Sequence, residues 1–285
     1  MVVNIYDVTV GVPTRNNIET IVKCINSILS QSTQRIKIVV SDNASSDGSG
    51  ALLKRMFSGN CNVKILEQES NVGAATNFAK LIQQCDTEFF MWLGGDDYIS
   101  EDFIDVNLKF LNANPDYIAS SSFPIFLKED HEIPGVSIDL EGNLKSRLVN
   151  FFRYANRSHN VFYSLLRTEE VKRYPYFGSE FAAADWAFDL YLISKGKIRT
   201  NGPGNVFFGT NGVSRNQNAN RQYKTSLAGK FLPLLPFSRR ALRIFLRKPH
   251  VYLILFSFIC RINWTQFKVD CIWVKRRLFS NEIWK

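Results

Sequence analysis

The segment LGGDDYIS, residues 93–100, places two adjacent carboxylates, Asp96 and Asp97, directly after the apolar run EFFMW. A short apolar run that ends in Gly and Asp is typical of a buried strand that reaches the surface. Carboxylates held close together repel each other, and the repulsion raises the pKa of the pair. A cation relieves it, and carboxylate oxygens are ligands that hard ions such as Mg²⁺ prefer. The pair therefore predicts a site for a divalent cation, or for a ligand that carries one.

Three further polar segments, PTRNN, SDNASSDGS and QESNVG, each follow a strand-like apolar run. Between these runs, apolar residues recur at helical spacing, as in NIETIVKCINSILSQ. Strands that alternate with helices predict an α/β fold with a mostly parallel sheet and helices on both of its faces. Ligands bind such sheets at the carboxyl ends of the strands. We therefore expect the four polar segments to meet at one edge, although each one alone is also ordinary turn chemistry.

The second part of the chain continues with weaker patterns. PDYIASSS, NVFYSLLR and NVFFGT, which begin at residues 115, 160 and 205, predict three more strands. FAAADWAFDLYLISKG predicts an amphipathic helix that ends at Gly196. We expect this part to provide the site for a second substrate, and the polar segment 209–221 to be a loop that closes over the first one.

The composition bounds the class of protein. The 285 residues, 45% of them apolar, suffice for one large domain or for a domain with an appendage. The five cysteines are odd in number and show no CxxC spacing, and the three histidines lie far apart. This favours reduced thiols and argues against a zinc site. The first residues, MVVNIYDVTVGVPTRNN, lack the pattern of a secretory signal, so we expect a protein that stays inside the cell.

The positive charge of the chain is concentrated at its end. Residues 221–285 carry 14 Lys and Arg and 2 acidic residues, a net charge of +12, whereas the rest carries a net charge of −3. The apolar segment VYLILFSFIC is shorter than the roughly 20 residues that span a bilayer. This predicts an interfacial helix on an anionic membrane surface. The basic side chains expected to face the headgroups are Arg239, Arg240, Arg243, Arg247 and Lys248. A helical appendage packed on the body is the alternative.

Taken in order, the blocks VGVPTRNN, VVSDNASSDGS, NVGAATN, LGGDDYIS and AADW resemble the family 2 glycosyltransferases, which have the GT-A fold and use nucleotide-activated sugars. The resemblance covers residues 7–122 well and residues 160–212 loosely. It implies donor-binding residues at Pro13, Thr14 and Arg15 near the nucleotide, at Asp42 near the base, and at Asn71, Gly73 and Asn77 along the diphosphate. It also implies that Asp96, supported by Asp97, binds Mg²⁺ or Mn²⁺ between the phosphates.

The family's catalytic carboxylate corresponds to Asp185 in AADW, which the resemblance makes the general base for an acceptor hydroxyl. The alternative for Asp185 is a carboxylate that only stabilises the start of a helix. Asp189, one turn later, is expected to be structural. The sequence departs from the family at Gly94, where an acidic residue is usual, and lacks an arginine often found near the end of the NVGAATN block.

The resemblance thus implies an inverting hexosyltransferase that extends a lipid-linked oligosaccharide in the synthesis of a surface polysaccharide such as an O-antigen or a capsule. We expect a GT-A domain over residues 1–220, with a donor half (1–122) and an acceptor half (123–220), and a membrane-associating region over residues 221–285. The protein would lie in the cytoplasm, peripheral on the inner face of the cell membrane, without a nucleic-acid partner. The alternatives are a sugar-phosphate nucleotidyltransferase and a non-enzymatic nucleic-acid-binding protein with a basic tail.

Overall fold

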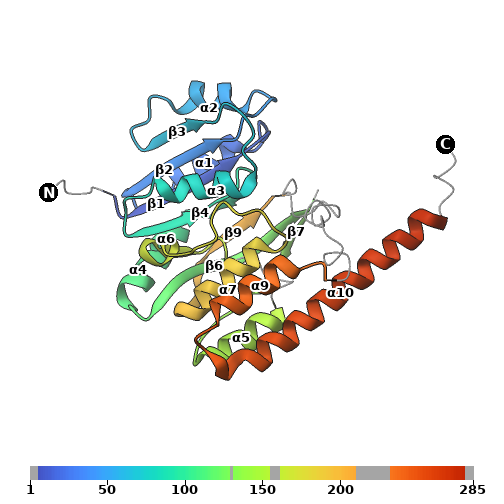
Figure 1. Ribbon diagram of the computed structural model, residues 1–285. Coiled ribbons are helices and arrows are strands. Elements are labelled where there is room, and N and C mark those ends of the chain that lie inside the picture. Colours follow the sequence, from blue (N-terminus) through green and yellow to red (C-terminus); the bar gives the residue numbers. More distant parts are fainter. Residues whose placement is uncertain (1–5, 129–130, 155–160, 210–231, 280–285) are drawn as a thin grey trace.

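The computed structural model describes residues 6–128, 131–154, 161–209 and 232–279 (Figure 1). The strands form one nine-stranded sheet in the order β3-β2-β1-β4-β8-β6-β9-β5, with β7 paired to β6. They are β1 (Val8–Thr14), β2 (Ile36–Asp42), β3 (Val63–Glu67), β4 (Phe89–Trp92), β5 (Tyr98–Ile99), β6 (Tyr117–Lys128), β7 (His131–Pro134), β8 (Leu165–Arg167) and β9 (Lys197–Phe208). The helices are α1 (Ile21–Leu29), α2 (Ser49–Phe57), α3 (Ala74–Gln83), α4 (Phe103–Ala113), α5 (Leu144–Tyr154), α6 (Thr168–Lys172), α7 (Ala184–Lys195), α9 (Leu235–Ile244) and α10 (Tyr252–Phe279).

The sheet is parallel in its first half and mixed as a whole. Strands β1, β2, β3 and β4 run parallel. Strand β8 is antiparallel to both β4 and β6, while β9 is parallel to β6 and antiparallel to β5. The predicted α/β fold is therefore confirmed, and the uninterrupted parallel part of the sheet is formed by β1 to β4. Apart from Gly209, the polar segment 209–221 lies outside the described residues.

The strand predicted over residues 160–167 is only partly correct. Strand β8 begins at Leu165, and a turn precedes it in which the Ser164 N–H donates to the Val161 carbonyl at 3.3 Å. The aromatic residues of this turn, Phe162 and Tyr163, line a cavity. Aromatic residues are also common in strands, so the pattern predicts a strand. Strand β9 begins at Lys197, earlier than predicted, because it pairs with β6 over a long stretch interrupted by register shifts.

Two apolar cores lie on the two faces of the sheet. Successive residues alternate between them, since Phe89 and Met91 belong to the core under α1, α2 and α4, whereas Phe90 and Trp92 belong to the core under α3 and α7. Helix α3 packs so closely on β1 that a Cβ on Gly11 would lie 3.0 Å from Leu81 and Phe90. This close contact fixes the position of α3 relative to β1.

The C-terminal helices pack on the body. Helix α9 lies against α7, and α10 lies against α5 and α9 (Figure 1). Phe237 of α9 and Phe245, directly after α9, are fully buried in the core beneath α7. The Phe258 ring of α10 stacks on Phe152 with centroids 3.7 Å apart. The described part of the tail is thus a packed helical unit, as the alternative interpretation predicted.

Two of the five basic side chains predicted to face a membrane face the protein instead. The guanidinium carbon of Arg240 lies 4.0 Å from the centre of the Phe181 ring, and Lys248 donates to the Ser194 carbonyl oxygen of α7. The prediction was wrong for these two residues because helix packing turns one side of α9 and of the segment after it toward α7. Arg239, Arg243 and Arg247 are exposed.

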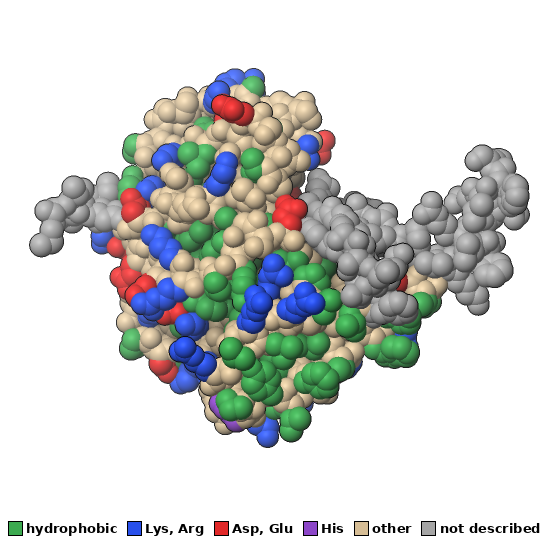
Figure 2. Space-filling model, viewed as in Figure 1, with side chains coloured by type: hydrophobic (Ala, Val, Ile, Leu, Met, Phe, Trp, Pro, Cys, Tyr) green, Lys and Arg blue, Asp and Glu red, His purple; other side chains and the backbone are tan. Residues whose placement is uncertain are grey.

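The outer side of the same helices carries exposed apolar side chains. Figure 2 shows hydrophobic side chains gathered low on this face, where α9 and α10 lie, with Lys and Arg above them. Leu253 is 85% exposed, and the other exposed apolar residues here are Leu246, Phe256, Trp264, Val269 and Ile272. None of the helices within the described ranges is both long and apolar enough to cross a membrane.

Candidate active site

The four polar segments meet at the carboxyl ends of the parallel strands, as predicted. The Asn43 N–H donates to the Thr14 carbonyl at 2.9 Å, which joins the loops after β1 and β2. The Asn43 side chain donates to the Asn71 side chain at 2.9 Å and so reaches the loop after β3. The Gly95 N–H donates to the Pro13 carbonyl at 3.2 Å, which adds the loop after β4. Backbone and amide groups thus connect segments that are far apart in the sequence.

Two of these loops contain a non-glycine residue in the left-handed region, as does the entry to α7. The φ angles are 56° at Asn16, 55° at Ala44 and 62° at Ala183. Alanine rarely adopts this conformation, which costs on the order of 1 kcal/mol and persists only where the surrounding contacts enforce it. Among the described non-glycine residues with positive φ, all three lie at this edge or at the start of the helix that carries Asp185. Such strain is concentrated at functional sites.

Asp96 and Asp97 both turn toward the backbone at Gly94. A Cβ at Gly94 would lie 2.6 Å from Asp97 Oδ2 and 3.2 Å from Asp96 Oδ1, so the glycine leaves the space that both carboxylates occupy. Asp97 is only 6% exposed, and its Oδ1 accepts the Gly209 N–H at 2.8 Å. The departure from the family at Gly94 therefore has a steric reason in this chain.

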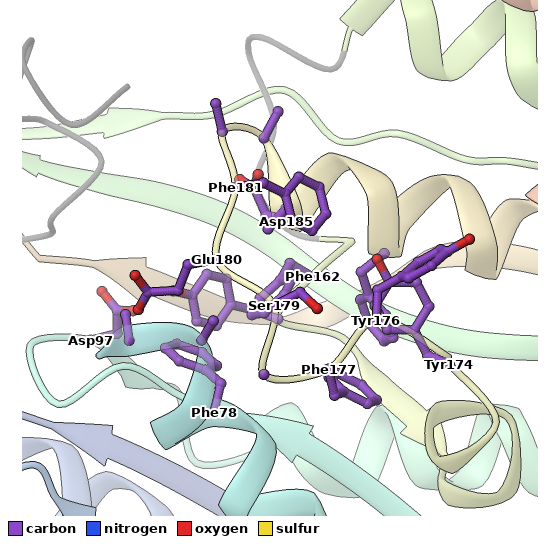
Figure 3. A pocket seen from close by; sticks show the side chains of 18 of the residues that line it. Phe78, Asp97, Phe162, Tyr174, Tyr176, Phe177, Ser179, Glu180, Phe181 and Asp185 are labelled. Atoms are coloured by element: carbon purple, nitrogen blue, oxygen red, sulfur yellow. The ribbon is translucent and has the colours of Figure 1, made fainter. Parts of the chain in front are cut away.

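A cavity of about 520 Å³ joins this pair to Asp185 (Figure 3). Its lining includes Asp96, Asp97 and Asp185, the start of α3 and a loop before α7. Figure 3 shows Asp97 and Glu180 toward one end of the view and Tyr174 and Tyr176 toward the other. The aromatic residues of its wall are Phe78, Phe126, Phe162, Tyr163, Tyr174, Tyr176, Phe177, Phe181, Phe188 and Phe208. A carboxylate from each half of the chain thus faces one largely aromatic space.

Asp185 lies in the first turn of α7, and its Oδ1 accepts the Trp186 N–H at 2.9 Å. This position fits both of its predicted roles, because a carboxylate here stabilises the helix start and also reaches the cavity. Asp189 is 5% exposed and lies one turn later. Burial, and then the charge of Asp185, raise the pKa of Asp189 well above its usual range. Both effects favour the protonated form of Asp189, as suits a structural residue.

Burial and the carboxylates of the site raise the pKa values of two groups nearby, Tyr163 and Cys24. Burial raises the pKa of the Tyr163 phenol, and Asp97, Asp96 and Asp185 add to the increase. Burial also raises the pKa of the Cys24 thiol, with further contributions from Asp97 and Asp96, and its Sγ donates to the Gly94 carbonyl at 3.3 Å. Both groups stay protonated, so Cys24 is a structural donor and Tyr163 a potential hydrogen-bond donor in the cavity.

The residues predicted to bind the nucleotide lie at the ends of β1 and β2 or directly after them. Thr14 Oγ1 donates to Asn17 at 2.9 Å beneath Gly95, and Arg15 is exposed next to it. Asp42 ends β2 and accepts both the backbone N–H, at 3.3 Å, and the hydroxyl of Ser45. Their contacts with a nucleotide remain predictions.

On the diphosphate side, Asn71 Oδ1 accepts the N–H of Gly73 at 3.0 Å, and Gly73 has a φ of 82° directly before α3. Asn77 is 3% exposed, accepts the Ser41 hydroxyl at 2.6 Å and donates to the Ser41 carbonyl at 3.1 Å. In the described contacts Asn77 links α3 to β2, and a contact with the diphosphate remains a prediction.

Sequence patterns did not indicate Tyr163 or Glu180. Glu180 lies on the loop before α7, and a Cβ on Gly73 would lie 2.1 Å from its Oε1. This acidic side chain therefore rests on the start of α3. The available signal was the clustering of aromatic residues around SEFAAADW, which is typical of a cavity wall as well as of a core.

The match to a protein family agrees with this geometry. The family model described as Glycosyl transferase family 2 matches residues 9–171, more than half of the chain. The chain therefore belongs to glycosyl transferase family 2.

Two curated relatives share part of this region. Glycosyltransferase GlyG of Streptococcus pneumoniae serotype 4 is 31% identical over 98 residues, which are 34% of this chain and 33% of that protein. Glycosyltransferase GlyA of the same organism is 29% identical over 103 residues, which are 36% of this chain and 14% of that protein. The matches thus span a third or less of the length of these relatives.

Two solved structures share the fold. S. aureus TarS superposes with a TM-score of 0.58 at 15% identity, over 84% of this chain and 50% of that chain. Mannosyltransferase PcManGT from Pyrobaculum calidifontis, in complex with GDP-Man and Mn²⁺, superposes with a TM-score of 0.56 at 17% identity, over 96% of this chain and 88% of that chain. The predicted GT-A fold is therefore confirmed.

The buried Asp189 predicts a pH-dependent stability. In the unfolded chain this carboxyl loses its proton near the ordinary pKa of an aspartate, about 3.9, whereas the folded protein retains the proton to higher pH. The folded state then binds more protons, so its stability falls as the pH rises above about 4, by at most about 1.4 kcal/mol per pH unit. We expect Asp189→Asn to remove this slope and to gain stability over the wild type in urea unfolding between about pH 4 and pH 7.

Asp116→Asn is the control with the opposite sign. A hydrogen bond from Lys197 lowers the pKa of Asp116, so its stabilising effect is lost as the pH falls below about 4. If Asp189→Asn is instead less stable than the wild type by the same amount at every pH, Asp189 makes a necessary contact and its titration is not the cause.

Proposed function

We propose that the chain is an inverting glycosyltransferase that moves a hexosyl group from a nucleotide sugar to a hydroxyl group of a lipid-linked glycan. The observation that carries the proposal is the shared cavity in which Asp96 and Asp97, at the ends of the parallel strands, face Asp185 from the second half of the chain. One side suits the diphosphate of a donor and the other suits an acceptor. Transfer between two substrates requires this arrangement.

A nucleoside diphosphate sugar is the proposed donor. Neighbours with the same fold were solved with such molecules: TarS 1-349 with UDP-GlcNAc, at a TM-score of 0.54 and 17% identity over 83% of this chain and 73% of that chain, and PcManGT with GDP-Man. In this chain the nucleotide would lie over the joined loops at Thr14, Asp42 and Asn71. The diphosphate would lie near the start of α3, where the helix dipole favours negative charge.

The residues present fit a divalent ion bound together with the donor. Asp96 and Asp97 approach the same point beside Gly94, but no group of three or more His, Cys, Asp or Glu residues suited to a metal occurs in the part of the chain that the structure describes. Mg²⁺ is commonly held by one or two carboxylates together with substrate phosphates. Asp96, with Asp97 behind it, would hold Mg²⁺ or Mn²⁺ in this way, and the ion would neutralise charge on the departing diphosphate.

Asp185 is the proposed general base for a single displacement. The acceptor oxygen forms a bond to the anomeric carbon while the bond from that carbon to the diphosphate oxygen breaks. The acceptor proton passes to the Asp185 carboxylate, and the nucleoside diphosphate leaves with the bonding electrons. Attack opposite the leaving group inverts the anomeric carbon. The Trp186 N–H, which donates to Asp185 Oδ1, and the helix start keep this carboxylate oriented.

The exposed apolar side of α10 favours the proposal that the acceptor lies in a membrane. Leu253, Phe256 and Trp264 are exposed on it, and Arg243 and Arg247 are exposed nearby on α9 and just after it. Apolar side chains that enter the headgroup region, flanked by cations, are typical of peripheral binding to anionic lipid. We propose that this surface holds the enzyme on the cytoplasmic face of the membrane, next to a lipid-linked oligosaccharide of a surface polysaccharide.

Replacement of the base tests the reaction. A general base contributes on the order of 10² to 10⁴ in rate, so Asp185→Asn should lower kcat by that factor and leave donor affinity nearly unchanged. Release of UDP or GDP from a panel of nucleotide sugars, with lipid-linked and alkyl glycoside acceptors, measures the rate. Asp189→Asn is the control, one turn along α7. If Asp189→Asn has the larger effect, the wrong carboxylate has been assigned.

Metal dependence has a readout independent of turnover. A donor that binds only the folded protein raises its melting temperature. With Asp96 holding the ion, Mn²⁺ should increase the shift that UDP-GlcNAc or GDP-mannose produces, and Asp96→Asn should remove the increase while the fold persists. Asp102→Asn, outside the cavity, is the matched control. Equal shifts with Mn²⁺ and with EDTA would contradict the metal role.

Membrane binding is testable with three substitutions on α10. Truncation of the tail would expose the core at Phe237, so point variants are preferable. Serine at Leu253, Phe256 and Trp264 should weaken binding to phosphatidylglycerol-rich vesicles by at least about 10-fold, because each side chain loses apolar burial. Met56→Ser, an exposed apolar residue on α2, is the control. Wild-type protein that ignores these vesicles at low salt would contradict the membrane proposal.

A further inference from the structure

The loop that forms the aromatic wall of the cavity is held from outside the catalytic domain. Residues 174–184 line the cavity almost continuously, and the last of them, Ala184, begins α7. Ala183, the residue before α7, has a strained φ of 62°. A strained backbone keeps its conformation only when neighbouring contacts determine it. The position of Asp185 therefore depends on what supports this loop.

Arg240 of α9 supplies such a support. Its guanidinium carbon lies 4.0 Å from the centre of the Phe181 ring and 5.4 Å from that of Tyr176, both of which line the cavity. Its Nη1 donates to the Pro236 carbonyl at 3.1 Å, so the side chain is anchored on its own helix. A guanidinium held over two rings fixes both by cation–π attraction and by planar stacking.

The environment of Arg240 differs from that of its neighbour. Arg239 is exposed, whereas the Nε atom of Arg240 is buried and has no hydrogen-bond partner among the described residues. The same is true of the Tyr174 hydroxyl, at the start of the loop. A buried donor without a partner is unfavourable. The ring contacts of Arg240 offset part of this cost.

At its other side, the loop meets the donor half. The Glu180 carboxylate rests on Gly73, where a Cβ would lie 2.1 Å from Oε1. The segment between Tyr176 and Ala183 is therefore fixed by α9 on one side and by the start of α3 on the other. A shift at Arg240 would move the aromatic wall and the approach to Asp185, but not the donor loops after β1 and β2.

We propose that Arg240 is a positioning residue of the acceptor site, through which the C-terminal region sets the geometry of the loop that ends at Asp185. This inference rests on the proposed function, because it takes the aromatic side of the cavity as the acceptor side. The C-terminal region is then a part of the catalytic unit as well as a membrane-facing surface. Arg240 acts on the acceptor through Phe181 and Tyr176 and does not itself touch the reacting atoms.

Arg240→Ala, Arg240→Lys and the control Arg239→Ala test the proposal, all without membranes. The measured quantities are the rate of transfer from UDP-GlcNAc or GDP-mannose to an octyl glycoside, the KM of each substrate, and the hydrolysis of the donor by water. Arg240→Ala should lower kcat/KM for the acceptor by about 3- to 30-fold, the range of a cation–π contact. Donor KM should be nearly unchanged, donor hydrolysis should fall by no more than the transfer to the acceptor, Arg240→Lys should recover part of the loss, and Arg239→Ala should match the wild type.

Amide hydrogen exchange of the folded protein gives a second readout that needs no substrate. Arg240→Ala should increase exchange in residues 176–184 and leave β1 and β2 unchanged. Equal losses for donor and acceptor, no recovery with lysine, or the same effect in Arg239→Ala would overturn the positioning role. If the wild type releases no nucleoside diphosphate from any donor, the proposed function fails, and unchanged exchange at residues 176–184 would separately reject the role of Arg240.

Discussion

The site depends on one hydrogen bond that joins the two halves of the sheet. Asp97 Oδ1 accepts the Gly209 N–H at 2.8 Å, immediately before β5 and immediately after β9. The two strands pair there, and the rings of Tyr98 and Phe207 stack with centroids 4.4 Å apart. A carboxylate buried this far is unfavourable unless its oxygens are bonded or a cation lies near it. The backbone of the second half satisfies one oxygen, and the other faces the space beside Gly94.

The proposed donor half, residues 1–122, could be predicted closely from the sequence. Helix α1 lies within the predicted segment NIETIVKCINSILSQ, because its apolar residues recur at helical spacing. The meeting of four loops also followed, since parallel strands present their carboxyl ends at one edge. The orientation of the side chains within those loops did not. Asn77 is an example, because its burial depends on how closely α3 packs on β1 at Gly11.

The proposed acceptor side could be predicted only in outline. Asp185 was found because its block resembles a family motif, and the structure brings it to the same cavity as Asp96. Tyr163 and Glu180 were missed because their positions depend on antiparallel pairing and on a turn between distant segments. Aromatic residues carry no periodicity that separates a cavity wall from a core. The strand predicted over residues 160–167 was correct only for Leu165–Arg167 for this reason.

The composition of the C-terminal helices predicted their exposed basic surface but not the contact of Arg240 with the cavity wall. Their charge predicted basic side chains that face lipid, and Arg243 and Arg247 are indeed exposed. Helical periodicity, however, gives each helix two sides, and the side with Phe237, Ala241 and Phe245 is buried against the body. Arg240 lies between these sides, where its aliphatic stem can pack on apolar surface while its guanidinium reaches the rings of the cavity wall. A helix that rests on a membrane with one side and on the acceptor loop with the other would couple the position of the lipid surface to the geometry around Asp185.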